Sequence, residues 1–232
     1  MPPRMPARLR PTAPLAPDAI LVGDPGRSLL LAQELMEKPK MSNHARGLWG
    51  YTGRTAAGDA LTIQATGMGG PSAALVLADL AKLGVERAVR VGTCTAFDPA
   101  LRPGELLLAT AALATGGSAA SFGVAAGETV SPDPVLVERL RAELGDAAQA
   151  TTIASFDTMA GDADAAGEAG AADMQTLAVL ARAAALGIAA AAVLIVAESE
   201  DGEALEGDAL ERAAARCGRA AAKALSNPQA EG

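Results

Sequence analysis

The chain has 232 residues, of which 50% are hydrophobic, 20% are charged and 2% are aromatic, and its formal net charge is −8. This length and hydrophobic content are sufficient for one well-filled core in a single domain. The negative charge argues against a nucleic-acid partner, which normally needs a basic stripe, and the scarcity of aromatic side chains excludes a stacking platform for single strands.

The cysteine and histidine content excludes further classes of protein. Cys94 and Cys217 are too few to form a disulfide framework, so the sequence favours a reduced, cytosolic protein. One histidine, His44, and two separated cysteines do not provide the ligands of a structural zinc site. No apolar run reaches the ~18 residues that span a bilayer, so no membrane partner is expected.

The first 18 residues contain six prolines and three arginines. They lack the continuous apolar segment of a secretory signal, and their prolines oppose the amphipathic helix of a mitochondrial presequence. We therefore expect residues 1–18 to be a flexible arm and residues 19–228 to form a single domain.

The rest of the chain is predicted to alternate strands with helices. Strands are expected at 19–22, 49–55, 60–66, 86–91, 105–112, 151–154 and 190–197, and helices at 27–36, from the glycine turn at 67–72 to residue 83, and at 134–144, 173–186 and 208–225. The alanine-rich segment 160–172 is weakly patterned and is expected to form a mobile loop or an irregular helix. Several strands are continuous apolar runs, which is typical of a sheet covered on both faces. The pattern predicts an α/β fold with a mostly parallel or mixed sheet between helical layers.

Three glycine-rich turns follow predicted strands, at 23–27, 67–70 and 92–93. In open α/β sheets, ligands bind beyond the carboxyl ends of strands, where glycines let backbone N–H groups approach an anion. Arg27 and Arg90 lie beside two of these turns, and Arg46 lies in another loop. Each is consistent by itself with an ordinary turn and a solvated arginine, but together they indicate a phosphate site. No G-x-G-x-x-G opens the first helix, so the dinucleotide-binding fingerprint is absent.

The motifs at 23–27, 46–53, 67–72 and 90–94 resemble those of nucleoside phosphorylases of the uridine phosphorylase and hexameric purine nucleoside phosphorylase type. The similarity keeps the same order from about residue 19 to residue 225, and it is dense up to about residue 112. The resemblance implies a three-layer α/β/α domain whose mixed central sheet closes partly into a barrel.

The resemblance also implies a reaction and its partners. Phosphate would attack the anomeric carbon of a nucleoside and release the base and ribose 1-phosphate, as in nucleoside salvage. Inorganic phosphate would be a co-substrate, and neither a metal nor an organic cofactor would be used. The protein would form a homodimer or a hexamer built from dimers.

The family's functional residues can be transferred to matching positions of this sequence. The implied phosphate-binding residues are Gly23, Arg27, Arg46, Arg90 and Thr93, with Arg46 entering from a neighbouring subunit. The implied ribose- and base-binding residues are Met68, Thr93, Phe156, Met159, Asp173, Met174 and Gln175. The implied catalytic residues are Arg90, Glu198 and Arg212, the last of which is equally consistent with an ordinary surface arginine.

The second half of the chain departs from the family pattern. The family's Glu-Met-Glu motif reads Asp173-Met174-Gln175, and a glutamine offers fewer acceptors to ribose hydroxyls than a glutamate. Thr95 replaces the usual glycine after Cys94. The proton-donating Ser-Asp pair of the purine branch is missing. Counting along the chain from Gln175 places Glu198 at the position of that acid, with Glu200 and Asp201 as alternatives. The uracil-reading Gln-x-Arg pair is missing too. A nucleosidase, or a degenerate member that binds nucleosides or nucleotides without efficient turnover, therefore remain as alternatives.

Overall fold

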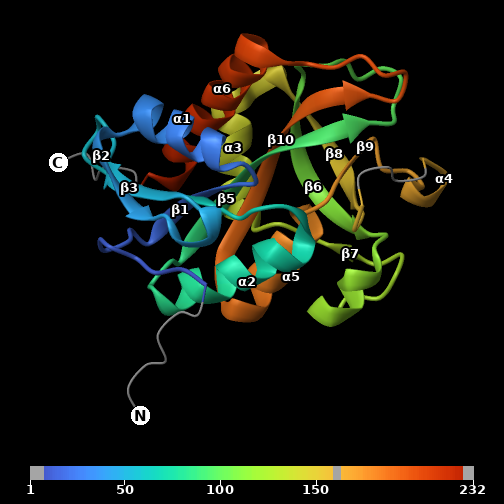
Figure 1. Cartoon of the computed structure of the whole chain (residues 1–232). Helices are drawn as coiled ribbons and strands as arrows, with labels where there is room; N and C mark the ends of the chain where they lie inside the picture. Colours follow the sequence, from blue (N-terminus) through green and yellow to red (C-terminus); the bar gives the residue numbers. More distant parts are fainter. Residues whose placement is uncertain (1–7, 159–162, 227–232) are drawn as a thin grey trace.

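The computed structural model describes residues 8–158 and 163–226 (Figure 1). Its strands are β1 (Asp18–Val22), β2 (Glu37–Asn43), β3 (Gly50–Arg54), β4 (Ala60–Ala65), β5 (Arg87–Ala96), β6 (Leu106–Ala114), β7 (Thr129–Val130), β8 (Ala148–Ser155), β9 (Ala171–Asp173) and β10 (Ala189–Ser199). Its helices are α1 (Pro25–Leu35), α2 (Gly69–Lys82), α3 (Pro134–Leu144), α4 (Ala163–Ala166), α5 (Thr176–Leu186) and α6 (Gly207–Leu225).

The strands form one mixed sheet, part of which closes on itself. In the open part, β1 is parallel to β4 and β5, and β3 is antiparallel to both β4 and β2. In the closed part, β5 pairs with β10, β10 with β6, β6 with β8, β8 with β9, and β9 returns to β5. This ring confirms the expected mixed sheet that closes partly into a barrel.

The interior of the ring is filled by small and medium apolar side chains. Every strand of the ring contributes to one buried cluster, which contains Cys94, Ala96, Leu101, Leu107, Ala109, Ile153, Ala171, Ala192, Leu194 and Val196. Alternate residues of a barrel strand face the interior, and a five-stranded ring has little room inside. The small side chains of Ala96, Ala109, Ala171 and Ala192 fit this narrow space.

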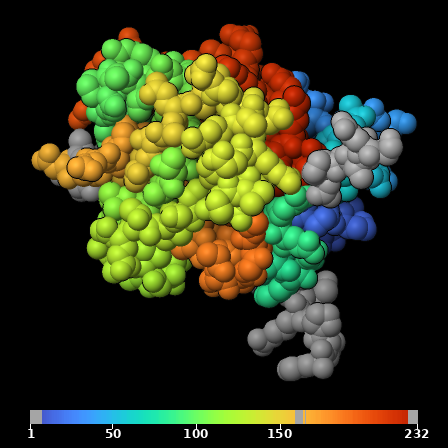
Figure 2. All heavy atoms as spheres, turned by 180° about the vertical axis from the view of Figure 1, so that it is seen from behind, coloured from blue at the N-terminus to red at the C-terminus, as the bar shows by residue number. Residues whose placement is uncertain are grey.

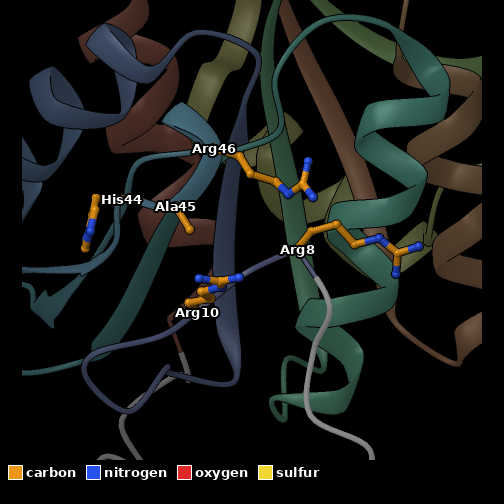
Figure 3. A pocket seen from close by; sticks show the side chains of 5 residues that line it. All are labelled: Arg8, Arg10, His44, Ala45 and Arg46. Carbon is orange, nitrogen blue, oxygen red and sulfur yellow. The ribbon is translucent and has the colours of Figure 1, made fainter.

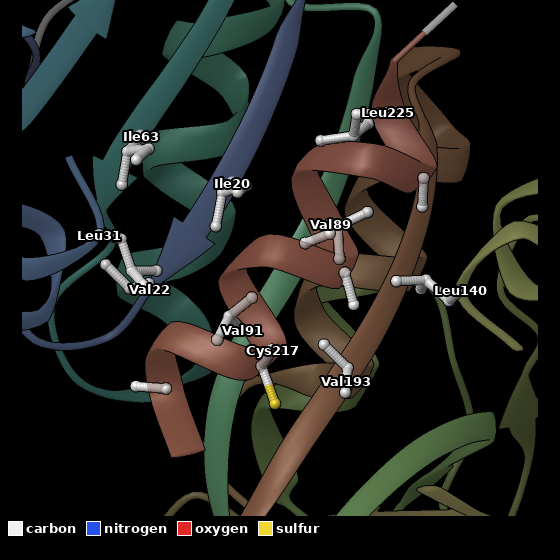
Figure 4. Close-up of a cluster of buried hydrophobic side chains, with 14 of the residues drawn as sticks. Ile20, Val22, Leu31, Ile63, Val89, Val91, Leu140, Val193, Cys217 and Leu225 are labelled. Carbon is white, nitrogen blue, oxygen red and sulfur yellow. The ribbon is translucent and has the colours of Figure 1, made fainter. Parts of the chain in front are cut away.

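Helices cover both faces of the sheet (Figure 1). Helices α1, α3 and α6 pack together on one face over a cluster that includes Ile20, Val91, Leu140 and Cys217 (Figure 4). Helices α2 and α5 pack together on the other face over a second cluster. These layers confirm the three-layer α/β/α arrangement. Figure 2, from behind, shows short α4 at the edge opposite the β2–β3 hairpin, as does Figure 1.

Several helix ends follow directly from local sequence. The Asp24 side chain caps α1 by accepting hydrogen bonds from the backbone N–H groups of Gly26 and Arg27, and proline follows at the first helical position. Asp133 caps α3 in the same way. Helix α5 ends at Gly187, whose φ of 72° belongs to the left-handed region that glycine tolerates. None of the helices in the described ranges is long and apolar enough to cross a membrane.

Residues 8–17 differ from the expected flexible arm, whose residues 1–7 lie outside the described part. Leu9 is buried, and its backbone N–H, like that of Arg8, donates to the buried carboxylate of Asp79. The N–H of Arg10 donates to Asn43, and that of Ala16 to the Thr62 hydroxyl. Prolines leave this segment few backbone donors, and buried side chains satisfy several of those that remain.

We expect neither cysteine thiol to react with a water-soluble disulfide reagent at pH 8 while the protein is folded. Both thiols are buried, and burial raises the pKa of Cys217 to about 12 and raises the pKa of Cys94 as well. The reactive thiolate is therefore scarce at pH 8 and the sulfur atoms are covered. Both thiols should react after denaturation in urea. Rapid reaction of one thiol per chain in the absence of urea would contradict this packing.

Candidate active site

Strand β5 changes its neighbour in the middle of the sheet. On one edge, β5 pairs with β1 as far as Arg90, and from Thr95 onward it pairs with β9 instead. Between these points, residues 91–94 pair with β10 alone among the described strands. Such switch points, beyond the carboxyl ends of parallel strands, are where α/β sheets bind ligands. Four of the predicted phosphate and ribose residues lie at or beside this point, namely Arg90, Thr93, Asp173 and Gln175.

Arg90 is held by several buried side chains at this switch point. It is buried, and its Nη2 donates to Asp173 Oδ2 at 2.8 Å, forming an ion pair. Its Nε lies 3.1 Å from the same oxygen, and its Nη1 donates to Gln175 Oε1 at 2.9 Å. The guanidinium is thus held in one orientation from two sides.

Residues of β8 and α5 also bind the carboxylate of Asp173. Its carboxylate accepts from the Ser155 hydroxyl at 2.8 Å, from the Thr176 hydroxyl at 2.7 Å and from the Thr176 backbone N–H. The Ser155 oxygen accepts in turn from the N–H of Leu177. Asp173 therefore joins β8 and the start of α5 to Arg90. Its oxygens are already used, so Asp173 orients Arg90, and ribose binding by Asp173 stays a prediction.

The Gln175 side chain is also hydrogen-bonded within the protein. It is buried, and its Oε1 accepts from Arg90 and lies 3.0 Å from the Thr66 hydroxyl. Its Nε2 donates to the carbonyl oxygens of Gly67 at 2.6 Å and Gly69 at 3.3 Å. A donor on one side and two carbonyls on the other fix the amide orientation, and both amide protons are used. Gln175 thus fastens the loop before α2 to Arg90.

Gly23 and Arg27, two further predicted phosphate-binding residues, lie in the first glycine turn and at the start of α1. A Cβ atom at Gly23 would lie 3.5 Å from the Gly67 carbonyl and 3.8 Å from Gln175 Oε1, so the first two glycine turns are adjacent. Burial lowers the pKa of Arg27, the negative charge of Asp24 opposes that effect, and the positive charge of Arg90 adds to it. The charge of Arg90 is thus felt at Arg27, and phosphate binding by these two arginines stays a prediction. Thr93 is half-buried on the stretch of β5 that pairs with β10 alone among the described strands.

We expect Gly92→Ala to lower the free energy of unfolding by about 1–3 kcal/mol. A Cβ atom at Gly92 would lie 2.5 Å from Arg90 Nη2 and 2.8 Å from Leu194 Cδ2. Both neighbours are buried, so Arg90 would have to leave Asp173. Urea unfolding would measure the loss. Gly117→Ala is the matched control because its Cβ would lie 3.7 Å from the nearest atom, an ordinary contact. Equal stability of the two variants would contradict a tight fit at Gly92.

The predicted base and ribose residues are only partly assembled. Phe156 and Met174 line a small pocket of about 10 Å³ together with Gly70 and Asp157. Met68 is 89% exposed at the start of α2. Met159 lies outside the described residues. The contacts of these residues with ribose or base stay predictions.

Three predicted residues lie away from Arg90. Glu198 is exposed near the end of β10, opposite Thr95 and after a bulge in that strand. Arg212 is exposed on α6. Arg46 is exposed in the β2–β3 loop, where it lines a pocket of about 310 Å³ with Arg8, Arg10, His44 and Ala45 (Figure 3). Their proposed roles in catalysis or phosphate binding stay predictions.

Sequence reasoning missed the residues that hold Arg90 and Gln175 in place. Thr66, Ser155 and Thr176 contribute hydroxyl groups from three separate elements, and each is buried. Their only sequence signal is position, since each lies at or just beyond the end of a strand or at the start of a helix. Across the described ranges, no cluster of three or more histidine, cysteine or acidic residues could hold a metal ion.

Comparisons with known proteins agree with this geometry. The sequence model of the Phosphorylase superfamily matches residues 17–226. A DeoD-type purine nucleoside phosphorylase of Oceanobacillus iheyensis is 37% identical over 99 residues, which are 42% of this chain and 42% of that protein. A second, of Geobacillus kaustophilus, is 37% identical over 102 residues, or 44% of this chain and 43% of that protein. The aligned region therefore spans less than half the length of these relatives.

A solved structure shows the same fold over most of the chain. It is that of purine nucleoside phosphorylase from Toxoplasma gondii in complex with immucillin-H. The TM-score is 0.82, the sequence identity is 23%, and the match covers 91% of each chain.

Proposed function

The chain belongs to the phosphorylase superfamily, and from this premise we propose that it catalyses the phosphorolysis of nucleosides to a free base and ribose 1-phosphate. The similar DeoD-type proteins are purine nucleoside phosphorylases, which supports this activity and favours a purine base. The similar solved structure, a purine nucleoside phosphorylase with immucillin-H, supports it too.

The observation that carries the proposal is the pair Arg27 and Arg90 at the switch point of β5. The positive charge of Arg90 contributes to lowering the pKa of Arg27, and Gly23 lies beside the Gly67 carbonyl and Gln175, which accepts from Arg90. Residues 91–94 of β5 lie where the partner on one edge changes from β1 to β9. A phosphate dianion held there would face two guanidinium groups, of which Arg90 is also paired with Asp173. Asp173 and Gln175 fix Arg90 in advance, so little reorganisation is needed when phosphate binds.

The reaction then follows from the position of the phosphate. One phosphate oxygen forms a bond to the anomeric carbon while the bond from that carbon to the base nitrogen breaks, and its electron pair stays on the base. The ribose passes through an oxocarbenium-like state, which the adjacent phosphate dianion stabilises. A purine base leaves more readily when it is protonated, and Glu198 is the proposed donor, carried by β10.

A second candidate function is binding of a nucleoside or nucleotide without efficient turnover. One observation favours it: both amide protons of Gln175 donate to backbone carbonyls, and its oxygen accepts from Arg90. The position that would hold the ribose hydroxyls is thus already bonded within the protein. Ribose would have to displace these bonds or use other groups.

A panel assay separates the two functions. Inosine, adenosine and uridine are incubated with and without inorganic phosphate, and free base and ribose 1-phosphate are measured by chromatography. Phosphate-dependent release of base, lost in Arg27→Ala and kept in Arg141→Ala, supports phosphorolysis. Arg141 is an exposed arginine on α3 and serves as the matched control. Release without phosphate indicates a nucleosidase, and binding without release indicates the second candidate.

We propose further that the active unit contains at least two chains. Arg46 is exposed and makes no hydrogen bond or ion pair within the described ranges. It could act on phosphate if a neighbouring copy supplied the other arginines. Mixing Arg27→Ala with Arg46→Ala chains tests this, because in mixed oligomers about a quarter of the sites would be intact. Recovery of about a quarter of the activity supports a shared site, and no recovery with mixed oligomers formed contradicts it.

A further inference from the structure

Arg46 has a backbone conformation that arginine does not favour. Its φ is 61° and that of Gly47 is 70°, so the loop between β2 and β3 contains two consecutive left-handed residues. Glycine adopts this region freely, but it is costly for arginine. The Arg46 side chain is exposed, and in Figure 3 it extends away from His44 of the same loop. Neighbouring elements must therefore hold the turn in this form.

Two buried amide side chains hold the carbonyl group of Leu48, two residues after Arg46. The Asn43 side chain, at the end of β2, donates through Nδ2 to the Leu48 carbonyl and to the Ala45 carbonyl. The Gln64 side chain, on β4, donates through Nε2 to the Leu48 carbonyl at 2.9 Å. Asn43 is 2% exposed and Gln64 is fully buried. Donors from two strands thus converge on one oxygen and fix the turn on both sides of Arg46.

The amide of Gln64 is held in one orientation. Its Nε2 also donates to the Ala65 carbonyl at 2.9 Å, so both amide protons are used. Gly50 lies opposite Gln64 in the β3–β4 pair, and a Cβ atom at Gly50 would collide with Gln64 Oε1 and lie 3.0 Å from Ser42 Oγ. The space around the amide is therefore filled. Gln64 Oε1 finds no hydrogen-bond partner among the described residues, so Gln64 acts on the loop through its donors alone.

We propose that Asn43 and Gln64 are positioning residues, which present the Arg46 guanidinium in one orientation to the phosphate bound by a neighbouring copy of this chain. This inference rests on the proposed function and on the shared site, because Arg46 acts there on the phosphate of the other copy. A turn that is already fixed loses less conformational freedom when arginine pairs with the anion. The two amides therefore raise the affinity for phosphate, and they leave the bond-breaking step unchanged.

A double-mutant cycle on the whole chain tests the proposal. Gln64→Met removes both donors at similar side-chain length, and the Leu48 carbonyl keeps the donor of Asn43. We expect the KM for phosphate to rise about ten-fold in Gln64→Met, while kcat at saturating phosphate and the KM for nucleoside change by less than about two-fold. Adding Gln64→Met to Arg46→Ala should have no further effect, because no guanidinium remains to be positioned.

The matched control is Ser42→Ala, which should leave the KM for phosphate unchanged. Ser42 is fully buried on β2 beside Asn43, and within the described ranges its hydroxyl has no hydrogen-bond partner. A merely structural role of Gln64 predicts the same loss with and without Arg46, and that result would overturn the proposal. An unchanged KM for phosphate in Gln64→Met would overturn it too. If Gln64→Met does not fold, Asn43→Ala takes its place in the cycle, with the same two outcomes, because it removes the other amide donor from Leu48.

Isothermal titration with inorganic phosphate repeats the cycle without chemistry and separates failure of this inference from failure of the proposed function. Phosphorolysis by the wild type, with losses from Gln64→Met and Arg46→Ala that simply add, overturns the positioning role alone. A wild type that releases no base from any nucleoside overturns the proposed activity, and an Arg46-dependent loss of phosphate affinity in Gln64→Met still supports positioning. A phosphate affinity that Arg46→Ala does not change overturns the shared site and the positioning role together.

Discussion

Replacing Arg90 with methionine should lower the free energy of unfolding by about 3–5 kcal/mol and abolish phosphorolysis. Arg90 is 5% exposed and forms an ion pair with Asp173, which is buried as well. Methionine has a similar length but no charge, so the carboxylate of Asp173 would stay buried without its cation. The phosphate would also lose one of its proposed arginines. Urea unfolding and the phosphate-dependent release of base measure the two losses.

The double variant Arg90→Met with Asp173→Asn separates stability from chemistry. Asparagine keeps an acceptor for Ser155 and Thr176 but removes the unpaired charge. We therefore expect part of the stability to return while the activity stays lost. The assignment of Arg90 would be wrong if the single variant were as stable and as active as the wild type.

Replacing Gln175 with glutamate should lower the free energy of unfolding by about 2–4 kcal/mol at neutral pH. The amide of Gln175 donates to the carbonyls of Gly67 and Gly69, and a carboxylate cannot donate to them. Asp173 and the new glutamate would also share Arg90, which raises the pKa of one carboxyl. We expect kcat/KM for nucleosides to fall. An increase of about ten-fold would instead identify Gln175 as an impaired ribose ligand, because a restored charge stabilises the oxocarbenium state.

The pH dependence of this variant gives an independent test. The pKa of the introduced glutamic acid should be higher in the folded protein than its unfolded value of about 4.3. Its destabilising effect is then present above the folded pKa and disappears as the pH falls below it, because a protonated carboxyl can donate to Gly67. Gln33→Glu, at an exposed position on α1, is the matched control and should change stability by less than about 0.5 kcal/mol. Loss of stability that is independent of pH would contradict this account.

The parts of the fold that sequence predicted well are those with strong local signals. Helix α3 was predicted with its observed bounds, because Asp133 and Pro134 begin it and Gly145 ends it. Strand β10 was evident as a long apolar run. The phosphate turns were found because glycines and arginines follow strands at short spacing. Family resemblance then supplied the barrel, which no local pattern indicates.

The parts that sequence missed depend on distant partners. Strand β2 has the sequence EKPKMSN, which is mostly polar and contains a proline, and its pairing with β3 places it at the sheet edge. Strand β9 has only three residues and lies where an irregular segment was expected. Its pairing with β5 brings Asp173 to Arg90, although the two residues are 83 positions apart along the chain and no spacing rule connects them.

The role of Gln175 also depends on partners that are distant in the sequence. The sequence alone shows that glutamine replaces the family's glutamate. The simplest interpretation of that change is a ribose ligand with fewer acceptors. The Thr66 hydroxyl and the carbonyls of Gly67 and Gly69 give the amide a different task, and these come from more than 100 positions away. Only the folded chain shows that a glutamine, rather than a glutamate, is complementary to this environment.

The closed ring of strands affects how the protein folds while it is being synthesised. Strand β10 pairs with both β5 and β6, and it is the last strand to leave the ribosome. Until Ala189–Ser199 is synthesised, β5 and β6 each have an open edge, which is a template for aggregation. Pairing over such long sequence separations is also slow. A fragment that ends before Ala189 would carry Gly23, Arg27 and Arg90 but would leave these edges of β5 and β6 without a partner, so we expect nascent chains to aggregate more readily than complete ones.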